Sequence, residues 1–311
     1  MRIVVIGAGA IGGFIAAALA RAGTEVAVVA RGEHLDAIKA RGITLVHSDL
    51  GPFTAKVRAS DDVRTLGAFD VAILTFKAHQ FPQLYSQLGT LSKTATKLVT
   101  LQNGVPFWYV REPALKSVDP GGRIGALFPD SQVIGGVIHV SGHITKPGCI
   151  HQSGGTRYVL GIPGGGTNGA VETLFSALKW AELHPEIDEN IRATLWLKLV
   201  NNVGLNSVST LHRVTLRQLL ERQTTRAEVR ALMEEALHVG QAIGAVEDAD
   251  IDSRLDYAAR LSDVKTSMLQ DYEAGRPLEL DPILGAAIEL ADRNGVEVPR
   301  MRETYERLAR L

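Results

Sequence analysis

Short aliphatic runs dominate the first half of the chain. Four runs that are apolar at successive positions stand at residues 2–7, 24–31, 69–77 and 96–104. Strands of this kind are buried on both faces, as in a parallel sheet. Helix-like segments at 12–23 and 32–42 lie between the first runs, and β-like runs at 131–162 indicate a hairpin-rich extension. The pattern predicts a parallel sheet covered by helices.

The pattern becomes helical after Pro185. Helix-like segments follow one another at residues 190–211, 226–245, 255–275, 281–295 and 300–311. Gly244, Gly275 and Gly295 stand where a glycine commonly ends a helix. The glycine-rich stretch 163–169 is typical of a loop. We therefore expect two domains, 1–187 and 188–311, of which the second is all-helical; a chain of 311 residues favours two domains in any case.

A glycine motif gives the first domain its function. Gly7-Ala8-Gly9-Ala10-Ile11-Gly12 follows the first strand, opens a small-residue helix and precedes a second strand. In this context the first glycine permits a tight turn, the second lets the backbone approach a pyrophosphate, and the third lets helix and strand pack closely. The sequence predicts an α/β protein with an N-terminal Rossmann-type dinucleotide-binding domain and an all-α C-terminal domain.

Three residues after strand ends are candidates for contacts with that dinucleotide. Arg31 ends the second strand, where a site for NAD usually carries an acid; a guanidinium there favours NADPH, although it could also be a solvated surface arginine. Lys77 and Asn103 follow later strands, where ligands of open α/β sheets bind. Lys77 could reach a cofactor phosphate, and Asn103 could contact the nicotinamide ribose or the substrate. A surface lysine and an Asn-Gly turn are the alternatives.

Composition excludes several other classes. The formal net charge of −1 favours neither nucleic acid nor a membrane surface as partner. A single cysteine, Cys149, cannot form an intramolecular disulfide, and the glycine-broken start resembles neither a signal peptide nor a membrane span. We expect a cytoplasmic protein. His139 and His143 lie in a strand-like segment, so no metal site is expected. A homodimer is left open.

Polar residues interrupt the apolar helix at 190–211. Lys198, Asn202 and Asn206 are four apart and would share one face of a regular helix. Such a helix either exposes this polar face to solvent or contributes it to a polar binding site. Ser267 and Glu279 interrupt later helix-like sequence and could complete a polar lining, with the lysine and the acid paired; an exposed serine and an exposed acid are the alternatives.

Six separated segments resemble one family. They are GAGAIG at 7–12, LTFKAHQ at 74–80, LQNGV at 101–105, LWLKLVNNVGLN at 195–206, SMLQDYEAGRPLELD at 267–281 and GVEVP at 295–299. Together they resemble 2-dehydropantoate 2-reductase (ketopantoate reductase). The resemblance implies an active site between a Rossmann domain and a helical domain. It also implies NADPH-dependent reduction of a 2-keto acid to a 2-hydroxy acid, with ketopantoate and (R)-pantoate of pantothenate biosynthesis as the expected pair.

The resemblance also implies roles for individual residues. Lys198 matches the catalytic proton donor, and Glu279 matches an acid that binds the cofactor near the lysine. The substrate-binding matches are Asn202, Asn206 and Ser267, of which the serine holds the substrate carboxylate. Asn103 matches a residue that touches cofactor and substrate, while Lys77 and Arg31 match cofactor contacts, Arg31 at the 2′-phosphate.

The chain departs from the family pattern in places. Leu278 replaces a usual threonine, Leu284 a frequent asparagine, and the aromatic run 107–109 a plainer segment. These residues could line a site for a bulkier or more apolar 2-keto acid, or the aromatic run could be ordinary core packing. A non-catalytic NADPH-binding sensor is a further alternative, which would need no acid–base residues in the second domain.

Overall fold

The computed structural model describes residues 1–47, 51–260 and 263–311. Contacts divide the chain into two compact units, each built from two segments. Unit 1 comprises Met1–Gln102 and Arg123–Ile191, and unit 2 comprises Asn103–Gly122 and Arg192–Leu311. The segment 103–122 thus packs with the helical half. The sequence analysis expected two contiguous domains, 1–187 and 188–311, and did not predict that 103–122 packs with the second. The assignment of the first domain to the cofactor and of the second to the substrate stays a prediction.

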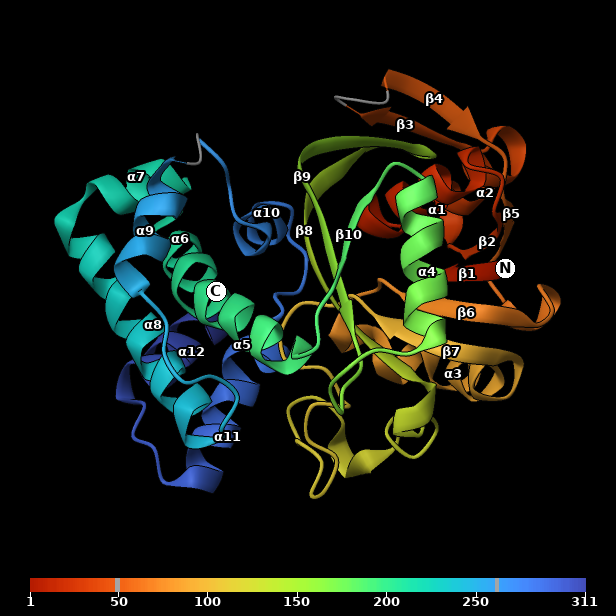
Figure 1. The fold of residues 1–311 in the computed structure, drawn as a ribbon. Coiled ribbons are helices and arrows are strands. Elements are labelled where there is room, and N and C mark those ends of the chain that lie inside the picture. The colour runs from red at the N-terminus through yellow and green to blue at the C-terminus, as the bar shows by residue number, and fades with distance from the viewer. Residues whose placement is uncertain (48–50, 261–262) are drawn as a thin grey trace. The chain divides into compact units, whose positions relative to one another are not determined.

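The described residues of unit 1 form a ten-stranded sheet in the order β4-β3-β9-β8-β7-β6-β1-β2-β5, with β10 paired to β9 (Figure 1). The strands are β1 (Arg2–Ile6), β2 (Glu25–Val29), β3 (Ile43–His47), β4 (Gly51–Ala55), β5 (Arg58–Ser60), β6 (Phe69–Leu74), β7 (Ala95–Thr100), β8 (Val133–Lys146), β9 (Cys149–Gly161) and β10 (His184–Ile187). Strands β1, β2, β5, β6 and β7 pair in parallel, and β8 and β9 form the expected hairpin. The predicted α/β class is confirmed.

The α-helices described in unit 1 are α1 (Ala10–Arg21), α2 (Gly32–Arg41), α3 (Phe81–Thr94) and α4 (Gly169–Trp180). Helix α1 buries Phe14, Ile15 and Leu19 in the main hydrophobic core of the unit, together with strand residues such as Ile3 and Val28. Its small residues serve close packing: a Cβ on Gly13 would lie 2.2 Å from Cδ1 of Ile150. The sequence expectation of a small-residue helix after the first strand is confirmed.

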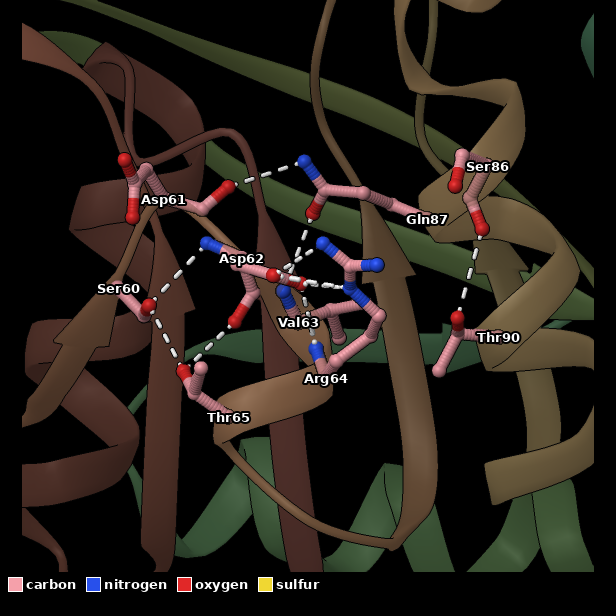
Figure 2. Close-up of polar contacts among 9 residues, drawn as sticks. All are labelled: Ser60, Asp61, Asp62, Val63, Arg64, Thr65, Ser86, Gln87 and Thr90. Atoms are coloured by element: carbon pink, nitrogen blue, oxygen red, sulfur yellow. Dashed lines mark hydrogen bonds and ion pairs between the residues drawn. The ribbon is translucent and has the colours of Figure 1, made fainter.

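A polar turn that follows β5 is hydrogen-bonded to α3 (Figure 2). The Gln87 side chain on α3 donates to the Asp61 carbonyl at 3.0 Å and accepts from the Val63 N–H at 3.2 Å. The carboxylate of Asp62 accepts from the Arg64 N–H, which caps the short 3₁₀ helix η1 (Val63–Thr65). These bonds hold the start of η1 against α3. In the first turn of α3, Gln83 contacts Arg31, which lies just after the end of β2.

Unit 2 is helical, as the sequence predicted (Figure 1). Its elements are α5 (Ile191–Asn201), the π-helical turn η5 (Asn202–Asn206), α6 (Ser207–His212), α7 (Leu216–Glu221), α8 (Gln223–Ala242), α9 (Ile251–Arg260), α10 (Ser267–Glu273), the π-helical turn η6 (Asp281–Gly285), α11 (Ala286–Asn294) and α12 (Pro299–Ala309). The expected helix at 255–275 is two helices, α9 and α10; its residues 261–262 lie outside the described part of the chain.

The predicted glycine stops are confirmed. Gly244, Gly275 and Gly295 all adopt positive φ, at 66°, 63° and 67°, just beyond α8, α10 and α11. Glycine reaches this left-handed region without the steric cost that a Cβ imposes. In the described ranges of the chain, no helix combines the length and the apolar character that crossing a membrane requires.

Candidate active site

The glycine motif forms a tight turn at the carboxyl end of β1. Gly7 has φ 98°, and a Cβ on Gly12 would lie 2.1 Å from the Gly7 oxygen and 2.3 Å from Oγ1 of Thr75. A Cβ on Gly9 would meet no atom of the described residues within 4 Å. The turn is therefore tightly packed at Gly7 and Gly12, whereas space remains beside Gly9. This space would let a dinucleotide phosphate approach the backbone.

Strand order places this turn at a switch point of the sheet. Strand β1 pairs with β2 on one side and with β6 on the other. The chain runs from β1 to β2 on one side, and after β5 it crosses to β6 on the other, so the strand order reverses beside β1. Ligands of open α/β sheets bind at such points. Thr75, which follows β6, donates from Oγ1 to the Gly7 carbonyl at 2.7 Å. Lys77 lies two residues further on and begins the 3₁₀ helix η2 (Ala78–Gln80), with its backbone N–H donating to Oε1 of Gln80.

Arg31 is exposed between β2 and α2. Its Nη1 donates to Oε1 of Gln83 on α3 at 3.2 Å. The glutamine orients a guanidinium that would otherwise be free to rotate in solvent. Gln83 was not among the residues that the sequence singled out, because nothing in its spacing indicated that α3 would face the end of β2. The role of Arg31 at a 2′-phosphate stays a prediction.

A second cluster of candidate residues lies wholly within unit 2. The ammonium of Lys198 donates to Oδ1 of Asn103 at 3.0 Å, and Nδ2 of Asn103 donates to Oε2 of Glu279 at 3.3 Å. An ammonium only donates and a carboxylate only accepts, so these partners determine which way the amide points. The structure thus joins three residues that are far apart in sequence into one chain of hydrogen bonds.

The environment of this cluster changes the acidity of its lysine. Burial lowers the pKa of Lys198 from 10.5 to about 8, while the Glu279 carboxylate opposes that drop by favouring the ammonium. Glu279 is itself buried. A lysine with a pKa near 8 is protonated at neutral pH and gives up its proton more readily than an ordinary lysine. Such a group is suited to general acid catalysis.

The backbone beside Asn103 is held against the segment beside Glu279. The N–H of Val105 donates to the Pro282 carbonyl at 2.7 Å, and Pro282 lies in η6, just after Glu279. Gly104 has φ 82°, and a Cβ there would lie 2.2 Å from the same carbonyl oxygen. Only glycine allows this close contact, so Gly104 and Pro282 set the separation of Asn103 and Glu279. The sequence analysis considered Gly104 only as part of an Asn-Gly turn.

Asn202 and Asn206 lie at the two ends of η5. The helix is therefore not the continuous α-helix that the expected shared face assumed, because its middle widens into a π-turn. Gly204 brings this turn close to α8, where a Cβ would lie 2.6 Å from Cγ of Met233. Nδ2 of Asn202 is buried and has no hydrogen-bond partner among the residues that the structure describes. Such an amide requires a partner, and a bound ligand can supply it.

Ser267 is exposed as the first residue of α10. The preceding residue, Thr266, caps this helix by accepting from the Leu269 N–H, and its hydroxyl contacts Oγ of Ser209 at 2.7 Å. Ser209 donates in turn to the Asn206 carbonyl at 3.1 Å. A buried hydroxyl pair therefore joins the start of α10 to the end of η5. The sequence did not single out Ser209 and Thr266, since isolated hydroxyl residues in helices carry no spacing signal.

The residues that depart from the family pattern lie mostly in the core of unit 2. Phe107, Trp108 and Tyr109 are each 2% exposed, and the Tyr109 ring packs against Trp196. Leu284 is fully buried, whereas Leu278 is partly exposed next to Glu279. Core packing therefore accounts for the aromatic run and for Leu284. Leu278 alone remains a candidate for contact with a substrate.

The histidines considered as metal ligands lie on a strand. His139 and His143 both belong to β8, as their strand-like surroundings indicated. His143 and His151 are opposite each other on β8 and β9, with ring centroids 5.2 Å apart. No group of three or more His, Cys, Asp or Glu side chains suited to a metal ion occurs within residues 1–47, 51–260 and 263–311.

Two family models match this chain. Residues 3–165 match the model described as "Ketopantoate reductase PanE/ApbA", and residues 190–311 match "Ketopantoate reductase PanE/ApbA C terminal". The two matches together cover most of both units. Every candidate residue named above lies within one of these ranges.

Individual proteins agree with the family models. A 2-dehydropantoate 2-reductase of Mesorhizobium japonicum is 39% identical over 93% of this chain and 91% of its own length. The crystal structure of 2-dehydropantoate 2-reductase from Methylococcus capsulatus is 31% identical, with a TM-score of 0.85 over 99% of this chain and 96% of that one. For 2-dehydropantoate 2-reductase from Geobacter metallireducens GS-15 the identity is 27% and the TM-score 0.88, over 100% and 99% of the two chains. The chain therefore belongs to the ketopantoate reductase family of dinucleotide-dependent oxidoreductases, as its separated motifs predicted.

Proposed function

We propose that this enzyme uses NADPH to reduce 2-dehydropantoate to (R)-pantoate, the reaction that supplies pantoate for pantothenate biosynthesis. The observation that carries the proposal is the Lys198–Asn103–Glu279 chain of hydrogen bonds, with the pKa of its lysine lowered to about 8. A sensor that only binds the dinucleotide does not need a buried lysine whose pKa is lowered. The names of the similar proteins support the same substrate.

The glycine turn fits the cofactor that the proposal requires. Backbone amides around Gly9 and the start of α1 would receive the pyrophosphate, since the turn is open on that side and helix N-termini favour anions. The motif residues concerned are Gly7, Ala8, Gly9, Ala10, Ile11 and Gly12. Arg31 would bind the 2′-phosphate with Lys77 as a second cation, which is the reason to propose NADPH over NADH. When bound, NADPH supplies the hydride that reduces the keto carbon.

Lys198 would complete the reduction. As the bond between hydride and carbon forms, the carbonyl π electrons move to oxygen, and an ammonium within hydrogen-bond distance stabilises that growing charge. The lysine then transfers its proton to the oxygen, which produces the hydroxyl of the 2-hydroxy acid. General acid catalysis of this kind typically contributes about 10²–10⁴-fold.

The remaining polar residues would hold the substrate and tune the lysine. The buried Nδ2 of Asn202, which finds no partner among the described residues, would donate to a substrate oxygen, with Asn206 beside it. The exposed hydroxyl of Ser267 would bind the substrate carboxylate. Asn103 would orient the ammonium and contact cofactor and substrate. Glu279 would bind the cofactor and keep the lysine charged by offsetting part of its desolvation.

A second substrate class is supported by Leu278. This partly exposed leucine stands beside Glu279 where the family usually has threonine, so it would favour a bulkier or more apolar 2-keto acid. The two candidates differ only in the side chain attached to the keto acid. Hydride transfer and the role of Lys198 are the same for both.

A panel of 2-keto acids tests the proposal. Each acid, 2-dehydropantoate included, is offered with NADPH while the loss of nicotinamide absorbance is followed. The proposal predicts the highest kcat/KM for 2-dehydropantoate, whereas a higher value for a bulkier acid would replace it by the second class. Absence of turnover with every acid, together with measurable NADPH binding, would favour the sensor.

A further inference from the structure

His34 links the glycine turn to two other segments of unit 1. It lies in the first turn of α2, and its Nε2 is 2.7 Å from the Ala8 carbonyl oxygen. Its other ring nitrogen, Nδ1, accepts a hydrogen bond from the Gly148 N–H at 3.1 Å. A backbone N–H can only donate and a carbonyl can only accept. The two partners therefore require a neutral ring that carries its proton on Nε2.

The Ala8 carbonyl is one of four successive carbonyls in the turn that all accept hydrogen bonds. The Ile6 and Gly7 oxygens accept from Thr75, and the Gly9 oxygen accepts from the Gly13 N–H at 2.8 Å. Because these oxygens are occupied by protein donors, they would not face a phosphate bound at the turn, which they would repel. The bond from His34 differs from the others because its donor comes from another helix, α2.

Helix α2 also begins directly after Arg31. Arg31 and His34 thus both lie at the start of α2. His34 is hydrogen-bonded to the glycine turn, and Arg31 is hydrogen-bonded to Gln83. In the proposed function, a dinucleotide that carries a 2′-phosphate would contact both places at once, its pyrophosphate at the glycine turn and its 2′-phosphate at the arginine. The separation of these two contacts depends on how firmly α2 is held against the turn.

The β8–β9 turn fixes the far side of the His34 ring. Gly148 has φ 78°, and a Cβ there would lie 3.1 Å from Cβ of Ala37 on α2. The Gly148 carbonyl accepts from the Thr44 N–H at 2.8 Å, so the donor to His34 is itself held in place. His34 is therefore hydrogen-bonded on both sides to backbone groups of unit 1.

We propose that His34 is a positioning residue for NADPH: its neutral ring holds α2 against the glycine turn and so sets the spacing between the pyrophosphate site and Arg31. The inference rests on the proposed use of NADPH. His34 contacts the turn and not the reacting atoms. Its loss should therefore weaken cofactor binding without slowing the chemical step, and it should weaken NADPH more than NADH, which has no 2′-phosphate.

Two substitutions at one position separate hydrogen bonding from packing. His34→Phe keeps a ring but removes both hydrogen bonds, whereas His34→Gln keeps a donor and an acceptor in one planar amide. His184→Gln, at an exposed position of β10, is the matched control. We expect His34→Phe to raise the Kd of NADPH about tenfold, the value of one to two hydrogen bonds. His34→Gln and the control should stay within about threefold of wild type.

The readouts distinguish positioning from general destabilisation. With His34→Phe, kcat at saturating NADPH should remain within about twofold, and the Kd of NADH should rise clearly less than that of NADPH. An unchanged Kd for NADPH, or equal losses for both cofactors, would overturn the inference. If His34→Phe does not fold, His34→Leu is measured with the same expectations. A wild-type protein that binds neither cofactor would instead contradict the proposed function.

Discussion

The ammonium of Lys198 and the side-chain oxygen of Asn103 lie 3.0 Å apart, and the other end of the same amide lies 3.3 Å from the Glu279 carboxylate. The amide therefore stands between a cation and an anion and holds both at a set distance. A direct ion pair would stabilise the charged lysine more strongly and make it a poorer acid. The spacing amide is consistent with a lysine whose pKa stays near 8.

The acidity of Lys198 predicts a pH profile. The proton donor must be protonated to act, and burial lowers its pKa to about 8. We expect kcat/KM to be level around pH 7 and to fall about tenfold per pH unit well above pH 8. The profile is measured with NADPH and the preferred 2-keto acid. A rate that stays level to pH 10 or so would show that no group with this pKa donates the proton.

Replacement of Glu279 should move that profile. Its carboxylate favours the charged lysine, so Glu279→Gln should lower the pKa of Lys198 and shift the alkaline fall in rate to lower pH. Glu273→Gln, at an exposed position of the same unit, is the control and should leave the profile in place. A shift to higher pH in Glu279→Gln would contradict the assigned electrostatic role.

Gly104 should tolerate no side chain. A Cβ there would lie 2.2 Å from the Pro282 oxygen, on a backbone with φ 82°. We expect Gly104→Ala to lower the free energy of unfolding by about 2–4 kcal/mol and to reduce kcat by displacing Asn103. Gly244→Ala has φ 66° and open space around the new Cβ, so it isolates the backbone cost of about 1 kcal/mol. Equal losses in the two variants would argue against the close contact.

Burial of Lys198 should also affect stability as a function of pH. Its folded pKa of about 8 lies below the ordinary value of 10.5. Between these values the unfolded chain holds a proton that the folded chain has released, so raising the pH through this window stabilises the wild type. The gain approaches about 3 kcal/mol.

Lys198→Met provides the comparison, because it lacks the titrating group. The difference in free energy of unfolding between this variant and wild type should shift in favour of wild type from about pH 7 to about pH 10. Chemical denaturation at both pH values measures it. A difference that does not change with pH would contradict the lowered pKa.

Arg31 should determine the choice of cofactor. Loss of charge-assisted hydrogen bonds to a 2′-phosphate is expected to raise the Kd of NADPH about 10- to 100-fold in Arg31→Ala, with the Kd of NADH within about threefold. Gln83→Ala should give a smaller effect in the same direction, because it frees the guanidinium without removing it. Equal affinity of Arg31→Ala and wild type for NADPH would identify Arg31 as a surface arginine.

Local patterns predicted the parts of this fold that local physics determines. Four continuous aliphatic runs became strands, the glycine motif formed its turn, and Gly244, Gly275 and Gly295 ended helices. Strands β3, β4 and β5 were not anticipated, since they are short and mix polar with apolar positions. Strands β4 and β5 lie at the sheet edges, and β3 lies between β4 and β9. Short strands of this kind depend on pairing with neighbours more than on their own composition.

Contacts between distant segments determine what the sequence could not reveal. In the π-turn at Asn202–Asn206, Gly204 lies close to Met233 of α8. The segment 103–122 belongs to unit 2, where Val105 bonds to Pro282. The spacing of apolar residues predicts a regular α-helix. It indicates neither a π-turn within that helix nor the unit in which a connecting segment packs. The family resemblance nevertheless indicated Lys198, Asn103 and Glu279 together, and the structure brings these three into one hydrogen-bonded chain.

The kinetics of Lys198→Ala test the central assignment most directly, with the exposed Lys116→Ala as control. If the lysine is the proton donor, kcat falls at least about a hundredfold in Lys198→Ala while the Kd of NADPH stays within about threefold and the control behaves as wild type. Turnover near the wild-type rate in Lys198→Ala would contradict the assignment, and another group would have to supply the proton.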